Sequence, residues 1–135
     1  MPVKPLAMFK GKVVNNKFFF PLSVNRTIVR DVVLDTGAAE LAFSKRVAEL
    51  LRLPRLGTVE VRGVSGTTSA YRSKCNLRVG NRTFINVPCI VIPQLPYSAL
   101  FGLRFFIDNQ LKLSLNPISQ TMTILAIPVK LRKLG

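Results

Sequence analysis

A carboxylate stands at the end of a predicted buried strand in the segment VVLDTGAAELAF, residues 32–43. The apolar run stops at Asp35, turns through Thr36 and Gly37, and then resumes. Carboxylates are scarce, since the chain holds 20 Lys and Arg but only six Asp and Glu. An isolated carboxylate in apolar surroundings costs several kcal/mol unless a partner compensates it. The tripeptide alone does not distinguish a catalytic acid from a turn in which Asp35 accepts backbone N–H bonds.

Histidine is absent from the sequence, which excludes several classes of chemistry. Ser-His and Cys-His nucleophiles, imidazole metal ligands and histidine general bases all require it. The two cysteines are too few for a zinc finger, and we expect no metal and no cofactor. Cys75 and Cys89 flank a predicted turn at Gly80-Asn81. If that turn closes a two-residue hairpin, Cys75 lies opposite Asn86 and Cys89 points to the other face, so we expect free thiols, as in a reducing cytoplasm.

The net charge of +14 favours an acidic partner, such as nucleic acid, an anionic surface or an acidic polypeptide. In VEVRGV and NLRVG the cations alternate with apolar residues, as on the solvated faces of strands. They form no cluster and no basic-aromatic motif, so nucleic acid is the less favoured partner. No apolar run approaches the roughly 20 residues that cross a bilayer, and the N-terminus has no signal-peptide pattern. We therefore expect a soluble, cytoplasmic protein without membrane contacts.

The hydrophobic pattern has a dominant period of two, which predicts an all-β fold. Turn sequences such as VNR, SGT, VGN and NPISQ separate the predicted strands, which cover residues 18–24, 28–34, 58–64, 70–79, 82–92, 111–115 and 121–127. The length of 135 residues suits one domain. We expect its core to cover about residues 15–127, with short extensions at both ends.

Residues 44–53 change to a helical period and predict one clear α-helix. Ser44 is the expected N-cap, and Pro54 follows the end of the helix. The predicted buried face consists of Phe43, Val47, Leu50 and Leu51. A second, shorter helix is predicted over residues 102–107.

Several motifs follow one another in an informative order. VVLDTGAAELAFSKRVAELLRLP leads an apolar run through Asp-Thr-Gly-Ala into the helix, and VEVRGVSGTTSAY follows as a hairpin with a glycine-bearing tip. Next come strands in INVPCIVIPQL, then SALFGLRFF with two apolar residues and a glycine before a short helix, and LKLSLNPISQTMTI as a closing hairpin. Over roughly residues 15–127 this order resembles the retropepsin-like (retroviral-type) aspartic proteases, as a cellular or prokaryotic-type member with a single motif. The resemblance implies a closed acid-protease-like barrel.

The resemblance also implies what compensates Asp35. Aspartic protease chemistry needs two carboxylates a hydrogen bond apart that share one proton, so that one activates a water while the other protonates the peptide carbonyl. The chain holds one Asp-Thr-Gly, and Asp31 and Asp108 lack the Thr-Gly that would orient them. The family therefore implies a homodimer in which Asp35 of each chain meets its twin on a two-fold axis.

The neighbours of Asp35 receive roles from the same resemblance. Thr36 would hydrogen-bond across the dimer beneath the two carboxylates. Gly37 would let the substrate backbone approach, and Ala38 would offer an apolar cleft wall.

Two further sets of residues are implied by position in the motif order. Packing behind the active-site loop is expected of Leu100, Phe101 and Gly102, which alone would be only a buried segment with a glycine. A flap that closes over an extended peptide is expected of Gly63, Val64, Ser65 and Gly66, which alone would be an ordinary hairpin turn.

Two positions depart from the viral members of the family. Those enzymes place Arg directly after the glycine of the later motif and an acid directly after Asp-Thr-Gly-Ala, and the two form an ion pair. The matching positions here are Leu103 and Ala39, which leave no unpaired charge. Glu40 and Arg104, each one residue further, would form a displaced pair. The C-terminal run TMTILAIPV suits a strand at the dimer interface; without such pairing the dimer must rely on contacts around the catalytic loop.

Together these features predict a homodimeric aspartic endopeptidase that cleaves extended polypeptides between apolar side chains. Because two carboxylates share one proton, activity is expected at acid to mildly acid pH, and the basic surface would favour acidic polypeptides. One alternative is an inactive protease-like module that dimerises or binds peptides, alone or beside nucleic acid. Another is a basic barrel that binds RNA, which would need exposed aromatic residues on adjacent strands.

Overall fold

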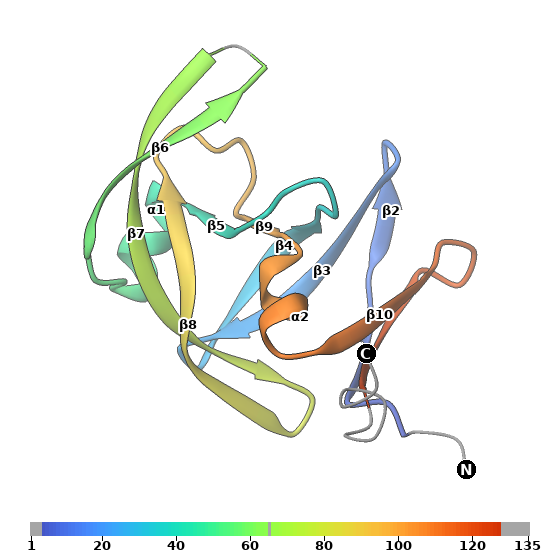
Figure 1. The fold of residues 1–135 in the computed structure, drawn as a ribbon. Helices are drawn as coiled ribbons and strands as arrows, with labels where there is room; N and C mark the ends of the chain where they lie inside the picture. Colours follow the sequence, from blue (N-terminus) through green and yellow to red (C-terminus); the bar gives the residue numbers. More distant parts are fainter. Residues whose placement is uncertain (1–3, 65, 128–135) are drawn as a thin grey trace.

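The computed structural model describes residues 4–64 and 66–127, which form two β-sheets and two short helices (Figure 1). The larger sheet has the spatial order β2 (Lys12–Val14), β3 (Lys17–Val24), β4 (Thr27–Leu34), β9 (Ala99–Phe101), β5 (Leu41–Ser44), β8 (Arg82–Ile92), β7 (Gly66–Val79), β6 (Gly57–Gly63). The smaller sheet has the order β1 (Ala7–Lys10), β11 (Thr121–Ala126), β10 (Leu111–Asn116). β3 also pairs with β7, so the larger sheet folds back on itself. The all-β prediction is confirmed.

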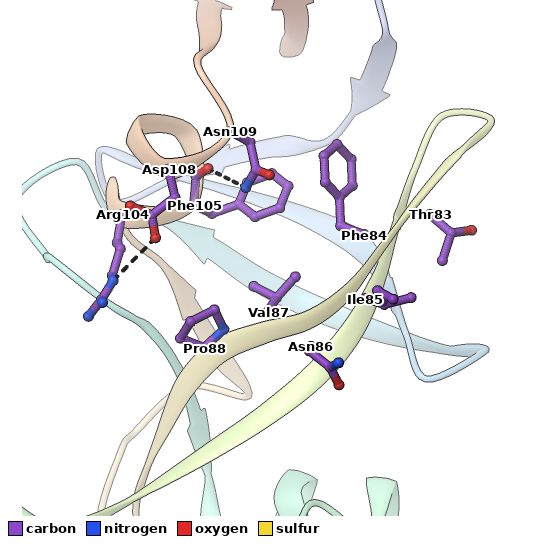
Figure 2. A pocket seen from close by; sticks show the side chains of 10 residues that line it. All are labelled: Thr83, Phe84, Ile85, Asn86, Val87, Pro88, Arg104, Phe105, Asp108 and Asn109. Carbon is purple, nitrogen blue, oxygen red and sulfur yellow. Dashed lines mark hydrogen bonds and ion pairs between the residues drawn. The ribbon is translucent and has the colours of Figure 1, made fainter.

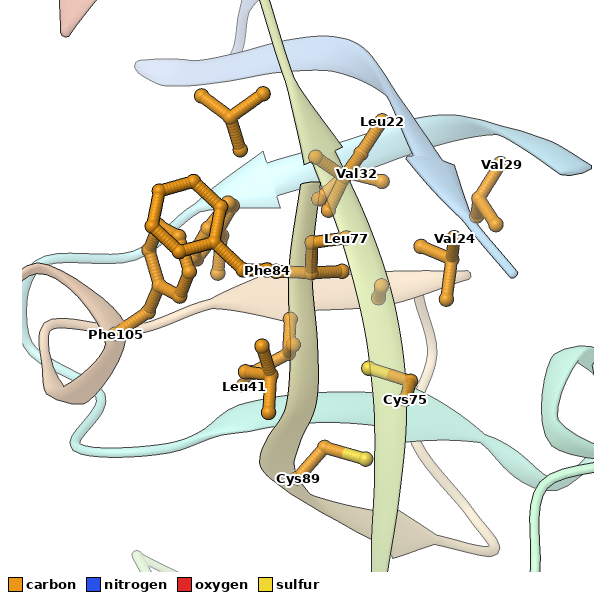
Figure 3. Packing of buried hydrophobic residues seen from close by; sticks show 14 of the residues in the cluster. Leu22, Val24, Val29, Val32, Leu41, Cys75, Leu77, Phe84, Cys89 and Phe105 are labelled. Atoms are coloured by element: carbon orange, nitrogen blue, oxygen red, sulfur yellow. The ribbon is translucent and has the colours of Figure 1, made fainter. Parts of the chain in front are cut away.

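Strict alternation explains the long strands. In β3 the side chains of Phe18, Phe20, Leu22 and Val24 are buried, and the residues between them face outward. The register with β4 shifts between Phe20 and Leu22, where Pro21 has no N–H to donate to a ladder. The buried faces of both sheets meet in one hydrophobic cluster. Figure 3 shows the part of this cluster that comes from the larger sheet and α2.

The first helix, α1 (Lys45–Leu51), begins as predicted. The Ser44 hydroxyl accepts a hydrogen bond from the Val47 N–H at 3.2 Å, which confirms the N-cap. Arg52 ends the helix in a left-handed conformation with φ 55°. The expected buried face was wrong at Leu50, which is 73% exposed. Leu51 is buried as predicted, and Ala48 is buried where Leu50 was expected. Phe43 is also buried, but it belongs to β5 rather than to the helix.

The second helix, α2 (Arg104–Asp108), starts two residues later than predicted. Phe105 and Phe106 are its buried residues. Their rings pack against Phe101 with centroid distances of 5.3 and 5.0 Å, so the core fixes the helix directly after β9.

Both cysteines are free thiols, as predicted, but the expected orientation of Cys89 was wrong. Asn86 has φ 55° and sits at a bulge, so Cys75 pairs with Val87 rather than with Asn86. The one-residue shift turns Cys89 to the same buried face as Cys75 (Figure 3). The hydrogen bond with Cys89 and burial both raise the pKa of the Cys75 thiol far above its ordinary value.

The N-terminal residues form two strands that the sequence analysis did not predict. β2 extends the larger sheet beside β3, while β1 pairs with β11 and contributes Ala7 to the core. Residues 121–126 do not offer the interface strand that was expected, because β11 lies between β1 and β10. The end of that run, residues 128 and 129, lies outside the described residues. Neither described helix is long and apolar enough to span a membrane.

Candidate active site

The loop that carries Asp35 is held at both ends by one strand. β9 runs parallel to β4, which precedes the loop, and antiparallel to β5, which follows it. Phe101 pairs with Leu34 on one side and with Leu41 on the other. The Asp35 N–H then donates to the Phe101 carbonyl at 3.1 Å. This pairing fixes where the strand ends and where the carboxylate begins.

The Asp35 carboxylate is half-buried and has one local partner. Its Oδ1 accepts a hydrogen bond from the Gly37 N–H at 3.0 Å, and its backbone carbonyl accepts from Ala38 at 3.1 Å. No other described residue donates to this carboxylate. Thr36 is exposed, and its hydroxyl has no hydrogen-bond partner among the described residues. A Cβ on Gly37 would meet only Asp35 Oδ1, at 3.4 Å.

Gly102 lies directly against the backbone of the Asp35 loop, residues 35–40. A Cβ at this position would lie 2.6 Å from the Ala38 carbonyl oxygen, 2.5 Å from that of Glu40 and 2.9 Å from the Ala39 carbonyl carbon. The next two amides hold the loop from the same side: Leu103 N–H donates to Ala38 at 3.0 Å and Arg104 N–H to Ala39 at 2.9 Å. No side chain fits at Gly102 without moving the loop.

The predicted displaced ion pair is confirmed. Arg104 Nη1 and Glu40 Oε1 are 2.8 Å apart, so the pair joins the end of the loop to α2. The hydrogen bond and charge of Glu40 raise the pKa of the Arg104 guanidinium, to which Asp108 adds a smaller contribution at 3.4 Å. Figure 2 shows Arg104 and Asp108 at a hollow of about 330 Å³ between β8 and α2.

A larger cleft, of about 910 Å³, opens between the Asp35 loop and the β6–β7 hairpin. Gly37, Ala38, Ala39 and Glu40 line one side, and Val59, Glu60, Val61 and Arg62 of β6 line another. Asp35 and Thr36 line a neighbouring hollow of about 390 Å³. Leu100 lines both spaces and connects them.

The β6–β7 hairpin projects from one end of the molecule (Figure 1). Gly63 pairs with Gly66 at its tip. Val64 is fully exposed and is not among the described residues that line the cleft. Ser65 lies outside the described residues. The hairpin therefore covers the cleft through its strands, in the conformation observed.

Sequence comparison identifies the family. Residues 20–108 match the model of the family described as gag-polyprotein putative aspartyl protease. The chain belongs to this retropepsin-like family. No curated protein matches the sequence closely enough to count as a relative.

Solved structures show the retropepsin-like fold of this family member. A retropepsin-like aspartic protease from Rickettsia conorii has 16% identity and a TM-score of 0.60, over 88% of this chain and 89% of that one. The EIAV protease complexed with the inhibitor HBY-793 has 20% identity and a TM-score of 0.63, over 76% and 96%. The retroviral protease-like domain of Ddi1 from Leishmania major has 17% identity and a TM-score of 0.56, over 82% and 93%.

The residues on the far side of the cleft were not predicted from the sequence. Arg72 and Lys74 of β7 line it, as do Ile90 and Ile92 of β8. Alternation along β7 could have indicated the two cations, but only the pairing register shows which cavity they face. No group of three or more His, Cys, Asp or Glu side chains among the described residues could hold a metal ion.

Proposed function

We propose that this protein is a homodimeric aspartic endopeptidase in which Asp35 of each subunit supplies one of two catalytic carboxylates. The observation that carries the proposal is the half-buried Asp35 carboxylate, which accepts one hydrogen bond from its own turn and stands at a strand end in a member of an aspartyl protease family. The other aspartates of the chain, Asp31 and Asp108, lack the Thr-Gly that would orient a second acid. A partner subunit would provide one.

In the proposed reaction the two Asp35 carboxyl groups share one proton across the two-fold axis. The ionised group accepts a proton from a water molecule as the water oxygen bonds to the peptide carbonyl carbon. The protonated group donates its proton to the carbonyl oxygen. In the second step the carboxyl group that took the water proton gives it to the amide nitrogen, and the other carboxylate takes a hydroxyl proton from the tetrahedral intermediate. The C–N bond breaks, the products are a carboxylic acid and an amine, and the two Asp35 groups again share one proton.

The positioning residues act through the catalytic loop. Contact with Gly102 and the amides after it supports a fixed position for the backbone of Ala38 and Ala39. Leu100 and Phe101 continue that support in β9. The exposed Thr36 hydroxyl is available for a hydrogen bond to the partner subunit.

Contacts around the catalytic loop are the proposed dimer surface. β11 is already paired on both sides, which argues against residues 121–126 as an interface strand. A largely apolar hollow of about 350 Å³ lies beside the loop instead, lined by Thr36, Gly37, Ala38, Ala39, Leu103, Arg104 and Ile107. Ile107 is 69% exposed there, and a second copy would cover it.

The hairpin tip from Gly63 to Gly66 is the proposed flap. Substrate would enter the cleft as an extended strand, and closure of the hairpin would exclude bulk water. Val64, exposed in the conformation observed, would reach the cleft only on closure.

Cleavage of an unfolded protein at acid to neutral pH, together with the mass of each protein in solution, tests the proposal. Asp35→Asn should abolish cleavage and leave a folded dimer. Asp31→Asn is the matched control, because Asp31 is exposed and has φ 60°, a conformation that asparagine also adopts. It should cleave like the wild type. If the wild type forms folded dimers but cuts no substrate across this pH range, the protease proposal is wrong and a peptide-binding module replaces it.

A further inference from the structure

The cleft carries more cations than carboxylates. Four basic residues line it, Arg62, Arg72, Lys74 and Arg104, and two acidic ones, Glu40 and Glu60. Glu40 is paired with Arg104 at 2.8 Å. Within residues 4–64 and 66–127, the other three cations form no ion pair.

The strand register shows that Arg72 and Lys74 face the cleft. Arg72 is the cross-strand partner of Ile90, and Lys74 is the partner of Pro88. Cross-strand partners share one face of a sheet, and Ile90 and Pro88 both line the cleft. Glu60 and Arg62 pair with Ser69 and Thr67, an odd number of residues from Arg72 along β7. Both therefore lie on the other face of the hairpin, and among the described residues Arg72 and Lys74 are the unpaired cations that face the cleft.

One row of cross-strand partners connects the catalytic end of the cleft to these cations. Leu100 pairs with Ala42, Ala42 with Ile90, and Ile90 with Arg72. The first three are apolar, so the side chains nearest the loop suit apolar substrate residues. Three strand spacings of about 4.8 Å separate Leu100 from Arg72 by roughly 14 Å, and an extended peptide rises about 3.3 Å per residue. A substrate residue that contacts Arg72 is therefore about four positions along the peptide from the substrate residue that contacts Leu100.

We propose that Arg72 and Lys74 select substrates that carry carboxylate side chains about three to five residues from the cleaved bond. The substrate class is an extended acidic polypeptide with apolar residues at the cleavage point. This inference rests on the proposed function, because the positions of the acidic residues are counted from the bond that the protease would cleave. In a two-fold dimer the pair of cations occurs at both ends of the cleft, so acidic residues on either side of the bond contribute.

The expected selectivity is moderate and depends on salt. Arg72 and Lys74 are exposed, and contacts between exposed charges are weak and screened by ions. Two such contacts should strengthen binding of an acidic peptide about fivefold to tenfold over its neutral counterpart at low salt. The preference should shrink as the salt concentration rises.

Peptide binding to the Asp35→Asn protein separates recognition from cleavage. The probe is a fluorescently labelled peptide with an apolar pair at its centre and Glu four residues away on each side; the reference peptide has Gln in both places. Anisotropy gives the two dissociation constants. Binding is measured again with Arg72→Gln/Lys74→Gln and with Arg30→Gln/Lys112→Gln. The second pair is the matched control, because Arg30 and Lys112 are exposed cations outside the cleft and both double variants lose the same charge.

The proposal predicts that the Glu peptide binds more tightly than the Gln peptide. Arg72→Gln/Lys74→Gln should abolish this preference, and Arg30→Gln/Lys112→Gln should keep most of it. Equal affinities for the two peptides, or equal losses in both double variants, would overturn the proposal. A single-stranded oligonucleotide gives a further test. If it displaces the Glu peptide, and Arg72→Gln/Lys74→Gln weakens its binding more than that of the Glu peptide, the proposal is overturned in favour of nucleic acid as the ligand.

Failure of the proposed function is distinguishable from failure of this inference. If tighter binding of the Glu peptide depends on Arg72 and Lys74 but the wild type cleaves no peptide, the cleft binds acidic peptides and the protease proposal is wrong. If the wild type cleaves both peptides with equal kcat/KM and binds them equally, the protease proposal stands and the selectivity falls.

Discussion

Replacing Gly102 by alanine should displace the Asp35 loop, which carries the proposed catalytic carboxylate. The new Cβ would lie 2.5 to 2.9 Å from three backbone atoms of Ala38, Ala39 and Glu40. Restoring ordinary contact at about 3.4 Å requires movements of about 0.5–0.9 Å, and a backbone cannot rotate away as a flexible side chain can. Overpacking of this kind costs about 1–3 kcal/mol. For a chain of 135 residues that lowers Tm by roughly 3–15 °C.

The kcat/KM of the Gly102→Ala protein should fall by more than its loss of folding stability alone would cause. A shift of about 1 Å in a catalytic group can cost roughly 100-fold in rate, and the Asp35 N–H is bonded to the residue just before Gly102. The measurements are kcat/KM, Tm by circular dichroism, and amide exchange at Leu103 and Arg104, whose N–H groups bond to the loop. Exchange at these two amides should accelerate, while exchange in β8 stays unchanged.

Gly63→Ala is the control for stability. A Cβ at Gly63 would meet its nearest atom, the Gly66 carbonyl oxygen, at an ordinary 3.8 Å. Its Tm should therefore stay within about 2 °C of the wild type. A Gly102→Ala protein with wild-type Tm, wild-type kcat/KM and unchanged exchange at residues 103 and 104 would refute the claim that this glycine holds the loop.

Three further changes test other parts of the structure. Ser44→Ala removes the cap of α1 and should lower the free energy of unfolding by about 1 kcal/mol, whereas Ser114→Ala in exposed β10 should change it little; equal effects in urea denaturation would contradict the cap. The raised pKa of Cys75 means that the unfolded chain loses this proton first, so the free energy of unfolding should fall above pH 9.0, the thiol's ordinary pKa, by about 1.4 kcal/mol per pH unit. Cys75→Ala should show a correspondingly shallower decline, and identical slopes would contradict the prediction. A double-mutant cycle of Glu40→Gln and Arg104→Gln should give a coupling of about 0.2–1 kcal/mol that shrinks with salt, because the Arg104 side chain is 51% exposed; a coupling indifferent to salt would contradict an exposed ion pair.

Strand periodicity predicted the long strands because they are long enough to alternate several times. β3 and β8 appear within one residue of their expected ends. β5 and β9 have only four and three residues, too few to show a period, and they were missed. These two short strands nevertheless hold the Asp35 loop, because β9 pairs with the strands on both sides of it. Their position depends on long-range pairing that local sequence does not encode.

A single bulge explains the main error of orientation. Counting outward from the Gly80-Asn81 turn places Cys89 on the wrong face, because Asn86 adds one residue to β8. The bulge is stabilised at a distance: the Asn86 N–H donates to the Asn76 side chain, and the Asn76 N–H donates to that of Asn25. No local pattern near the turn indicates this network.

In the candidate site, too, some residues were predicted from the sequence and others were placed only by the fold. The order of motifs predicted Asp35 and the glycine behind it, and the spacing of two charges predicted the pair of Glu40 with Arg104. Arg72 and Lys74 were visible only as outward-facing cations of a strand. Because the β6–β7 hairpin folds over the Asp35 loop, the outward face of β7 lines the cleft. Only the three-dimensional structure shows that Arg72 and Lys74 lie there.

Mixing of subunits tests the central claim, that each active site needs Asp35 from two chains. Wild-type and Asp35→Asn proteins are mixed at fixed total concentration, allowed to exchange subunits, and assayed for cleavage. If both carboxylates are required, activity follows the square of the wild-type fraction, so an equal mixture retains about a quarter of the wild-type rate. An equal mixture that retains about half of the rate, as expected if each chain acts alone, or about three quarters, as expected if one carboxylate per dimer suffices, would contradict the shared site.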